Sequence, residues 1–195
     1  MTRKLKVALL ANAKENAPRE VDQSSDQWDD LDSLKTIMSI VAAIEAGGHE
    51  CRYFEGNLAM VESLQSYQPD ICFNICEGHY GDGREAQIPA ILEMMRLPYT
   101  GSKVMTLALS LDKPMTKRVL FWHELPTPEF QVFERVDEPL NEDLHFPLFV
   151  KPSREGTGMG VSSKSIVYDE KELRQQIEEI ISHYKQPVLA ERYIE

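Results

Sequence analysis

Hydrophobic positions in the first half of the chain alternate between unbroken runs and helical spacing. The run at residues 4–11 predicts a buried strand, because a strand covered on both faces has a nearly continuous apolar sequence, and residues 49–54 and 70–75 predict a second and a third strand. Apolar residues three and four apart predict helices over residues 34–46 and 58–67. Strands that alternate with helices over short connections predict a parallel α/β domain. In the first of these helices the residues at helical spacing are Leu34, Ile37, Met38, Val41, Ile44 and Glu45, and Gly47-Gly48 should close it.

The second half of the chain shows the same two kinds of pattern. Helices are expected over residues 86–95, 102–111, 112–123 and 170–184, and strands over 129–134, 148–151, 161–167 and 188–195. The last helix is amphipathic and should bury Leu173, Ile177, Ile180 and Ile181. Pro152 is expected to stop the strand before it, because proline has no backbone N–H to donate.

Composition narrows the class of protein. The chain has 195 residues, 42% of them hydrophobic, which is enough for one large or two small domains with a real core. Its formal charge of −11 argues against nucleic acid, whose binding needs clustered lysine and arginine. A small anionic ligand stays open, because a local pocket can be basic in an acidic protein.

The cellular compartment is inferred from the absence of membrane-spanning and signal-peptide patterns in the sequence. No run reaches the ~18 apolar residues of a membrane span, and the first residues lack the apolar core of a signal peptide. We therefore expect a cytoplasmic protein without a membrane partner. Three cysteines fit a reducing compartment, and Cys72 and Cys76 are expected to be buried thiols rather than zinc ligands.

The stretch most suggestive of chemistry is Phe146-Pro-Leu-Phe-Val-Lys-Pro-Ser-Arg-Glu-Gly-Thr-Gly-Met-Gly-Val161. Lys151 ends a predicted strand, and three glycines follow at alternate positions. Glycines allow a loop to turn several N–H groups toward one point, which suits a phosphate beside a lysine. The spacing is neither a Walker loop nor the dinucleotide fingerprint. An ordinary glycine-rich hairpin remains the alternative.

Polar residues that could form a binding site lie at two further places in the sequence. The loop after the third strand carries Glu77, His79, Arg84 and Glu85, and ligands of parallel sheets lie at such strand ends. A solvated glycine turn is the alternative there. Lys113 should lie in the first turn of a helix capped by Asp112, where a cation opposes the helix dipole unless an anion is near. Its alternative is a solvated lysine.

Several motifs taken together resemble one family. They are, in chain order, Phe73-Asn-Ile-Cys-Glu-Gly, Arg84-Glu-Ala-Gln-Ile-Pro-Ala-Ile-Leu-Glu93, Leu97-Pro-Tyr-Thr-Gly-Ser102, Leu111-Asp-Lys-Pro-Met-Thr-Lys117, Phe146-Pro-Leu-Phe-Val-Lys-Pro-Ser-Arg-Glu-Gly, and Glu191-Arg-Tyr-Ile. Their order and spacing resemble the D-alanine–D-alanine ligases and related ATP-grasp proteins. The resemblance implies an N-terminal parallel α/β, Rossmann-like domain at 1–101 on the substrate side. It further implies the first, smaller α+β half of an ATP-grasp domain at 102–188, and the start of a third part at 189–195.

The resemblance implies an ATP-dependent carboxylate–amine ligase. ATP would phosphorylate a carboxylate, and an amine would attack the acyl phosphate. Amino acids or peptides would be the substrates, Mg²⁺ would accompany ATP, cell-wall peptidoglycan would be the pathway, and a homodimer would form through the N-terminal domain. Glu77 and Arg84 become substrate-side candidates. The residues matched to nucleotide binding are Lys113, Lys151, the lid residues Glu155, Gly156, Thr157, Gly158 and Gly160, the adenine acceptor Glu191, and the hinge residues Tyr193 and Ile194.

Departures from the family pattern matter as much. Residues 12–22 do not carry its opening motif, an insert contains Trp28, and its His-Gly is replaced by Glu77-Gly78. The family's paired lid serines appear here as Thr157-Gly158. A carboxylate in place of an imidazole should change which substrate group is bound.

The metal ligands of the family lie beyond Glu191, so none is expected in this chain, which reads as truncated and inactive alone. A catalytically dead module that binds nucleotide or a peptide precursor is the alternative. A carboxylase-type ATP-grasp enzyme is disfavoured by the motifs at residues 84–88 and 111–113.

Overall fold

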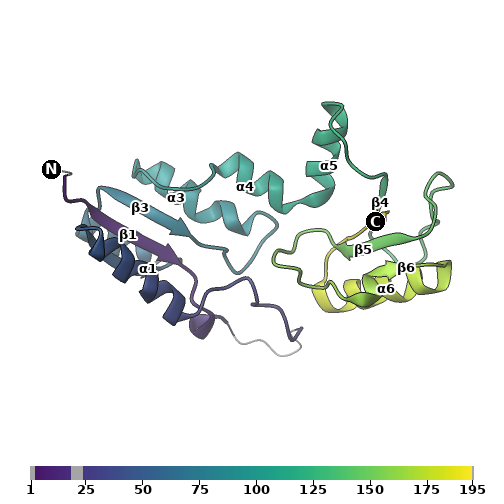
Figure 1. Cartoon of the computed structure of the whole chain (residues 1–195), viewed down its shortest axis with the longest axis horizontal. Helices are drawn as coiled ribbons and strands as arrows, with labels where there is room; N and C mark the ends of the chain where they lie inside the picture. Colours follow the sequence, from purple (N-terminus) through teal and green to yellow (C-terminus); the bar gives the residue numbers. More distant parts are fainter. Residues whose placement is uncertain (1–2, 19–23, 195) are drawn as a thin grey trace. The chain divides into compact units, whose positions relative to one another are not determined.

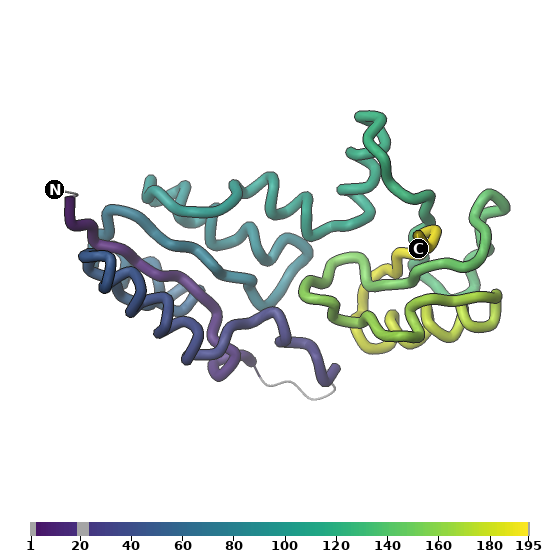
Figure 2. Tube along the Cα trace, viewed as in Figure 1, coloured from purple at the N-terminus to yellow at the C-terminus, as the bar shows by residue number. Residues whose placement is uncertain are grey.

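The computed structural model describes residues 3–18 and 24–194. The chain divides into two compact units, one made of Met1–Arg19 with Trp28–Ala108 and the other of Glu20–Gln27 with Leu109–Glu195. Each unit has its own sheet and its own hydrophobic core (Figures 1 and 2).

The first unit is built on a three-stranded parallel sheet in the order β2-β1-β3. The strands are β1 (Lys6–Ala11), β2 (Glu50–Glu55) and β3 (Ile71–Ile75). Helices α1 (Leu34–Ala46), α2 (Met60–Tyr67) and α3 (Gln87–Met95) belong to this unit, as does α4 (Val104–Leu111) as far as Ala108. The parallel α/β arrangement predicted from the alternation of strands and helices is confirmed.

The central strand β1 is covered on both faces. Ala8 and Leu10 pack into a cluster with α2 and α3, whereas Val7 and Leu9 pack into a cluster with α1. This explains why β1 reads as a continuous apolar run. Helices α1 and α3 accordingly lie on opposite sides of the strands (Figure 1).

The helix predicted from this spacing is confirmed as α1, but only some of the spaced side chains are buried. Ile37 and Val41 are buried, but Leu34 is 36% exposed and Met38 is 51% exposed. The stripe that contacts the sheet passes through Ile37 and Val41, with Ile40 and Ile44 partly buried beside them. Leu34 and Met38 flank this stripe on the helix surface and therefore reach solvent.

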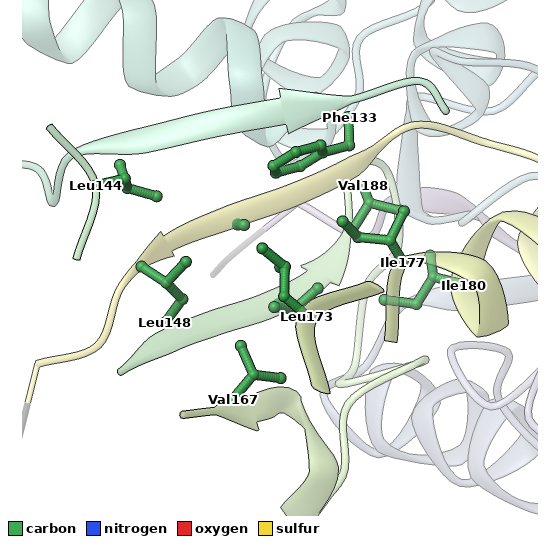
Figure 3. Close-up of a cluster of buried hydrophobic side chains, with 10 residues drawn as sticks. Phe133, Leu144, Leu148, Val167, Leu173, Ile177, Ile180 and Val188 are labelled. Atoms are coloured by element: carbon green, nitrogen blue, oxygen red, sulfur yellow. The ribbon is translucent and has the colours of Figure 1, made fainter. Parts of the chain in front are cut away.

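The second unit is built on a four-stranded sheet in the order β4-β7-β5-β6 with antiparallel pairs. Its strands are β4 (Phe130–Phe133), β5 (Leu148–Pro152), β6 (Ile166–Val167) and β7 (Val188–Arg192). Helix α6 (Glu170–Tyr184) covers one face, and α5 (Lys113–Trp122) precedes β4. Leu173, Ile177 and Ile180 of α6 meet Leu148, Val188 and Phe133 in one cluster (Figure 3).

Three strand boundaries in this unit differ from expectation. The strand predicted over 188–195 ends at Arg192 as β7. The strand predicted over 161–167 is only β6, because Ser162 and Ser165 form a capping box that favours a short 3-10 helix at Ser163–Ser165. Pro152 lies inside β5 rather than after it. The Ser153 N–H donates to the Pro187 carbonyl, so the nitrogen of residue 152 faces the side where β6 has already ended. No ladder bond is lost there.

Smaller elements complete the description. Short 3-10 helices occupy Lys14–Asn16 in the first long loop and Arg84–Ala86 before α3. Helix α5 begins at Lys113, and the Asp112 side chain accepts a hydrogen bond from the Met115 N–H at 2.9 Å, as predicted for its cap. Among the described helices, none combines the length and the apolar character needed to cross a membrane.

Candidate functional site

The register of the second sheet separates a core face from a polar face. Leu148 and Val150 of β5 pack on α6 together with Val188 and Ala190 of β7. Successive side chains of a strand point to opposite faces, so Phe149 and Lys151 lie on the other face. Glu191 of β7 pairs with Phe149 on one side and with Phe130 of β4 on the other. The sheet thus holds Glu191 beside Lys151, between two aromatic rings.

Glu191 is the centre of a charged cluster on this face. Its Oε1 accepts from Lys151 Nζ at 2.5 Å, and its Oε2 accepts from Lys117 Nζ of α5 at 2.7 Å. Burial raises the pKa of the Glu191 carboxyl, but the hydrogen bonds from Lys117 and Lys151 outweigh burial and leave that pKa below its usual value. Glu191 is therefore an anion at neutral pH.

Lys117 was not among the predicted site residues. Its side chain is 8% exposed, donates to Thr127 Oγ1 at 2.8 Å and lies 5.1 Å from the centre of the Phe130 ring. A signal was present in the sequence, because Lys117 follows Lys113 by four residues and shares its helix face. Without the fold, nothing indicated which carboxylate it would meet.

The predicted hinge residues continue from this cluster. Tyr193 stacks on Phe149 with ring centres 6.5 Å apart and planes inclined by 19°, and its N–H donates to the Pro147 carbonyl at 3.1 Å. Lys151 Nζ lies 5.4 Å from the centre of the same Phe149 ring. Ile194 is exposed. A flat aromatic surface therefore lies beside a carboxylate and a lysine.

Lys113 joins the start of α5 to the glycine loop. Its backbone N–H donates to the Ser153 carbonyl at 3.0 Å, and its Nζ donates to the Glu155 carbonyl. Glu155 Oε1 accepts from Gln186 Nε2 at 2.6 Å. The sequence did not predict this contact of Lys113 with a backbone oxygen of the loop, and its role toward a nucleotide stays a prediction.

The glycine loop, residues 155–160, leaves β5 and returns toward β6 (Figure 2). Gly158 has φ of +79° and open space around a Cβ, whereas Gly160 has φ of +70° and a Cβ there would lie 2.4 Å from Pro152 Cγ. Gly156 has open space, and Thr157 is exposed. Between these open positions Met159 is buried, an anchor that the sequence reading missed.

Three hydrogen bonds fasten the ends of this loop. Arg154 Nε donates to Asp112 Oδ2 at 3.0 Å, and Arg154 N donates to Gln186 Oε1 at 2.7 Å. At the other end the Gly160 N–H donates to Asp26 Oδ2 at 2.9 Å. The loop is tied at both ends while its middle glycines remain open.

The first unit holds the predicted substrate-side residues. Glu77 follows β3, and burial together with the charges of Glu85 and Asp30 raises its pKa to about 7. Arg84 is buried, and its Nη2 donates to Asp30 Oδ2 at 3.1 Å. The structure thus brings the predicted Glu77, Arg84 and Glu85 into one electrostatic cluster. The sequence reading missed Asp30, whose role depends on how the first long loop folds back.

Unsatisfied polar atoms also gather in this part of the first unit. Asp30 Oδ1 and His79 Nε2 are buried without a hydrogen-bond partner. Trp28, from the insert, meets the His79 ring edge-on with centres 5.3 Å apart. Gly78 has φ of +74°, and its N–H donates to Asn12 Oδ1 at 2.9 Å, so the turn is fixed from β1. The polar groups at this turn are therefore held in place, but two of their buried atoms make no hydrogen bond to any described residue.

Cysteines and acidic clusters add no metal site among residues 3–18 and 24–194. No group of three His, Cys, Asp or Glu side chains in this part of the chain could hold an ion. Cys51, Cys72 and Cys76 are free and buried, and burial was predicted for Cys72 and Cys76. Burial raises the pKa of Cys72 to about 11, so this thiol is protonated at neutral pH.

Comparison with known proteins gives matches along most of the chain. The sequence family described as D-ala D-ala ligase C-terminus matches residues 120–195. The D-alanine--D-alanine ligase of Syntrophotalea carbinolica is 33% identical over 162 residues, which are 83% of this chain and 51% of that protein. An uncharacterized protein, y4sG of Sinorhizobium fredii, is 34% identical over 165 residues, 80% of this chain and 48% of that protein. The chain spans about half the length of the curated relatives it matches.

Solved structures extend the similarity to the fold. The D-alanine--D-alanine ligase from Bacillus anthracis, crystallised with ATP, superposes with a TM-score of 0.71 at 25% identity. The match covers 98% of this chain and 59% of that one. The predicted fold class and the predicted family resemblance are both confirmed.

Proposed function

We propose that this chain, which resembles the D-alanine–D-alanine ligases of the ATP-grasp family in sequence and fold, is part of an ATP-dependent carboxylate–amine ligase. The observation that carries the proposal is the polar face of the second sheet, where Lys151 and Glu191 lie together beside Phe149. In the reaction, ATP phosphorylates a substrate carboxylate, and an amine then displaces phosphate from the acyl phosphate.

On this proposal the second unit binds the nucleotide. Lys151 and Lys113 would contact the phosphates, because phosphoryl transfer needs cations where negative charge spreads. Glu191 would accept a hydrogen bond from the adenine amino group, and the backbone at Tyr193 and Ile194 would line the adenine edge. The stacked rings of Phe149 and Tyr193 support a flat ligand there.

The glycine loop would act as the lid over the phosphates. Its glycines at 156 and 158 have open space where a side chain would stand, which suits a close approach by phosphate oxygens to the backbone. Excluding water protects an acyl phosphate, which hydrolyses readily. Mg²⁺ bound with ATP would neutralise phosphate charge, held by few protein carboxylates.

The first unit would bind the amino acid or peptide through Glu77 and Arg84. Because Glu77 replaces an imidazole of the family, we propose that D-alanine is not the preferred substrate. A cytoplasmic location, a role in peptidoglycan assembly and a homodimer through the N-terminal domain, residues 1–101, complete the proposal. The 195 residues alone are proposed not to form the peptide bond.

The test is an assay of the gene product that contains these residues, with ATP, Mg²⁺ and a panel of D- and L-amino acids. We expect release of ADP and phosphate together with a dipeptide, and loss of both in Lys151→Ala. Nucleotide binding without turnover by any amino acid would instead favour the dead module. The highest kcat/KM with D-alanine would overturn the substrate proposal alone.

A further inference from the structure

The two lysines that contact Glu191 are not equivalent. Lys117 is the more buried lysine, at 8% exposure against 22% for Lys151. Lys117 has a second hydrogen bond, to Thr127, and a ring beneath it, so its position is fixed from three sides. Within the described part of the chain, Lys151 Nζ contacts Glu191 and the Phe149 ring. Lys151 is therefore the lysine that can move.

The charges of the cluster do not cancel. Two lysines face one carboxylate, and each lysine occupies its own carboxylate oxygen. If Glu191 met Lys151 alone, the pair would be neutral, and an anion could take Lys151 only by leaving a largely buried carboxylate unpaired. Such a step is strongly unfavourable. With Lys117 in place, Glu191 stays paired when Lys151 moves.

We propose that Lys117 is a positioning residue for the phosphate site: it neutralises Glu191 and thereby leaves the charge of Lys151 available to an anion. This inference rests on the proposed nucleotide site and adds to it a residue that does not itself contact phosphate. It explains why α5 carries a buried lysine one turn beyond Lys113.

The experiment measures binding of inorganic triphosphate to the 195-residue chain by calorimetry at low ionic strength. Triphosphate lacks adenine, so the adenine role proposed for Glu191 does not enter. We expect Lys117→Met to weaken binding about tenfold, which corresponds to ~1.4 kcal/mol. Glu191→Gln added to Lys117→Met should restore binding to within about threefold of the wild type, because Lys151 no longer has an anionic competitor.

The restoration separates this role from a structural one. If Lys117 only supported the fold, the second substitution would not rescue binding, and the proposal would fail. Arg118→Met is the matched control, because it removes an exposed cation from the same helix, and it should leave the affinity within about twofold. An equal loss in Arg118→Met would show a general charge effect and overturn the proposal.

A further variant keeps the test decisive if Lys117→Met does not fold. Glu191→Gln alone should bind triphosphate at least as tightly as the wild type, and weaker binding would contradict the proposal. No binding by the wild type would also contradict it. The ligase proposal is tested separately, since absence of turnover leaves the triphosphate result standing.

Discussion

Glu191 and Glu77 are both partly buried glutamates, but their surroundings shift the carboxyl pKa in opposite directions. Glu191 lies within β7 between two lysines, whose hydrogen bonds outweigh burial and lower its pKa. Glu77 lies in the loop after β3, where burial and the charges of Glu85 and Asp30 raise its pKa to about 7. Burial acts in the same direction on both, so the neighbouring charges decide the sign.

The difference indicates two kinds of task. A carboxylate held anionic by fixed cations is a constant hydrogen-bond acceptor, suited to recognising an amino group of a ligand. A carboxyl with a pKa near 7 can gain or lose a proton at neutral pH, which is typical of groups that handle protons or bind a cationic group. The carboxylate of the second unit therefore keeps its charge near neutral pH, whereas the carboxyl of the first unit can change its charge there.

The largest stability effect is expected for Glu191→Ala. Removing the carboxylate leaves Lys117 and Lys151 together without their anion, and we expect a loss of about 2–3 kcal/mol, below the value for fully buried pairs. The pKa of Glu191 is lowered by folding, so its contribution is present above the unfolded pKa and is lost as pH falls through the folded one. Chemical denaturation at neutral and acidic pH measures this. Glu178→Ala, on the exposed side of α6, should change little, and equal losses in both variants would refute the account.

Lys151→Ala tests the same cluster through its ligand. Loss of a charge-assisted phosphate contact of roughly 1.5–3 kcal/mol should weaken ATP binding at least about tenfold. The fold should persist, because Lys151 contributes little to the core. ATP titration and thermal melting on the same variant give the answer, with exposed Lys171→Ala as control. Unchanged ATP binding with a lowered melting temperature would make Lys151 structural.

The glycine loop offers a comparison between neighbouring positions. Gly160→Ala places a Cβ against Pro152 in a left-handed conformation, and we expect a loss of about 1–2 kcal/mol. Gly156→Ala meets open space at an ordinary φ and should change the free energy of unfolding by less than about 0.5 kcal/mol. Denaturant titrations of both variants check the difference. Similar stabilities would show that the loop is not held at Gly160.

The smallest effect concerns Glu77 and pH. Because folding raises its pKa to about 7, the unfolded chain is ionised while the folded chain keeps the proton at intermediate pH. Stability contributed at this site therefore falls as pH rises from about 4.5 to 7 and is constant above that. Glu77→Gln should lack this fall and melt higher than the wild type at pH 8 by roughly 2–4 °C, a modest value for a partly solvated carboxyl. Exposed Glu62→Gln is the control, and a pH-independent difference would reject the assignment.

Sequence alone predicted the elements that local patterns determine, such as apolar runs for strands and capping residues for helix starts. The buried runs placed β1, β2 and β3, and the Asp112 cap placed the start of α5. It could not predict Lys117 against Glu191, because that contact joins helix α5 to strand β7, two elements far apart in the chain. Asp30 was missed for a related reason, since a long loop shows no periodicity to indicate where its carboxylate lies. The shortened β6 reflects a capping box of two serines that competes with the ladder.

The most direct test of the account follows backbone amide resonances of the 195-residue chain during an ATP titration. We predict that the largest shifts occur at Lys113, Lys151, residues 155–160 and residues 191–194, with little change at Glu77 and Arg84. Shifts centred on Glu77 and Arg84, or spread evenly over both units, would contradict the assignment of the nucleotide to the polar face of the second sheet.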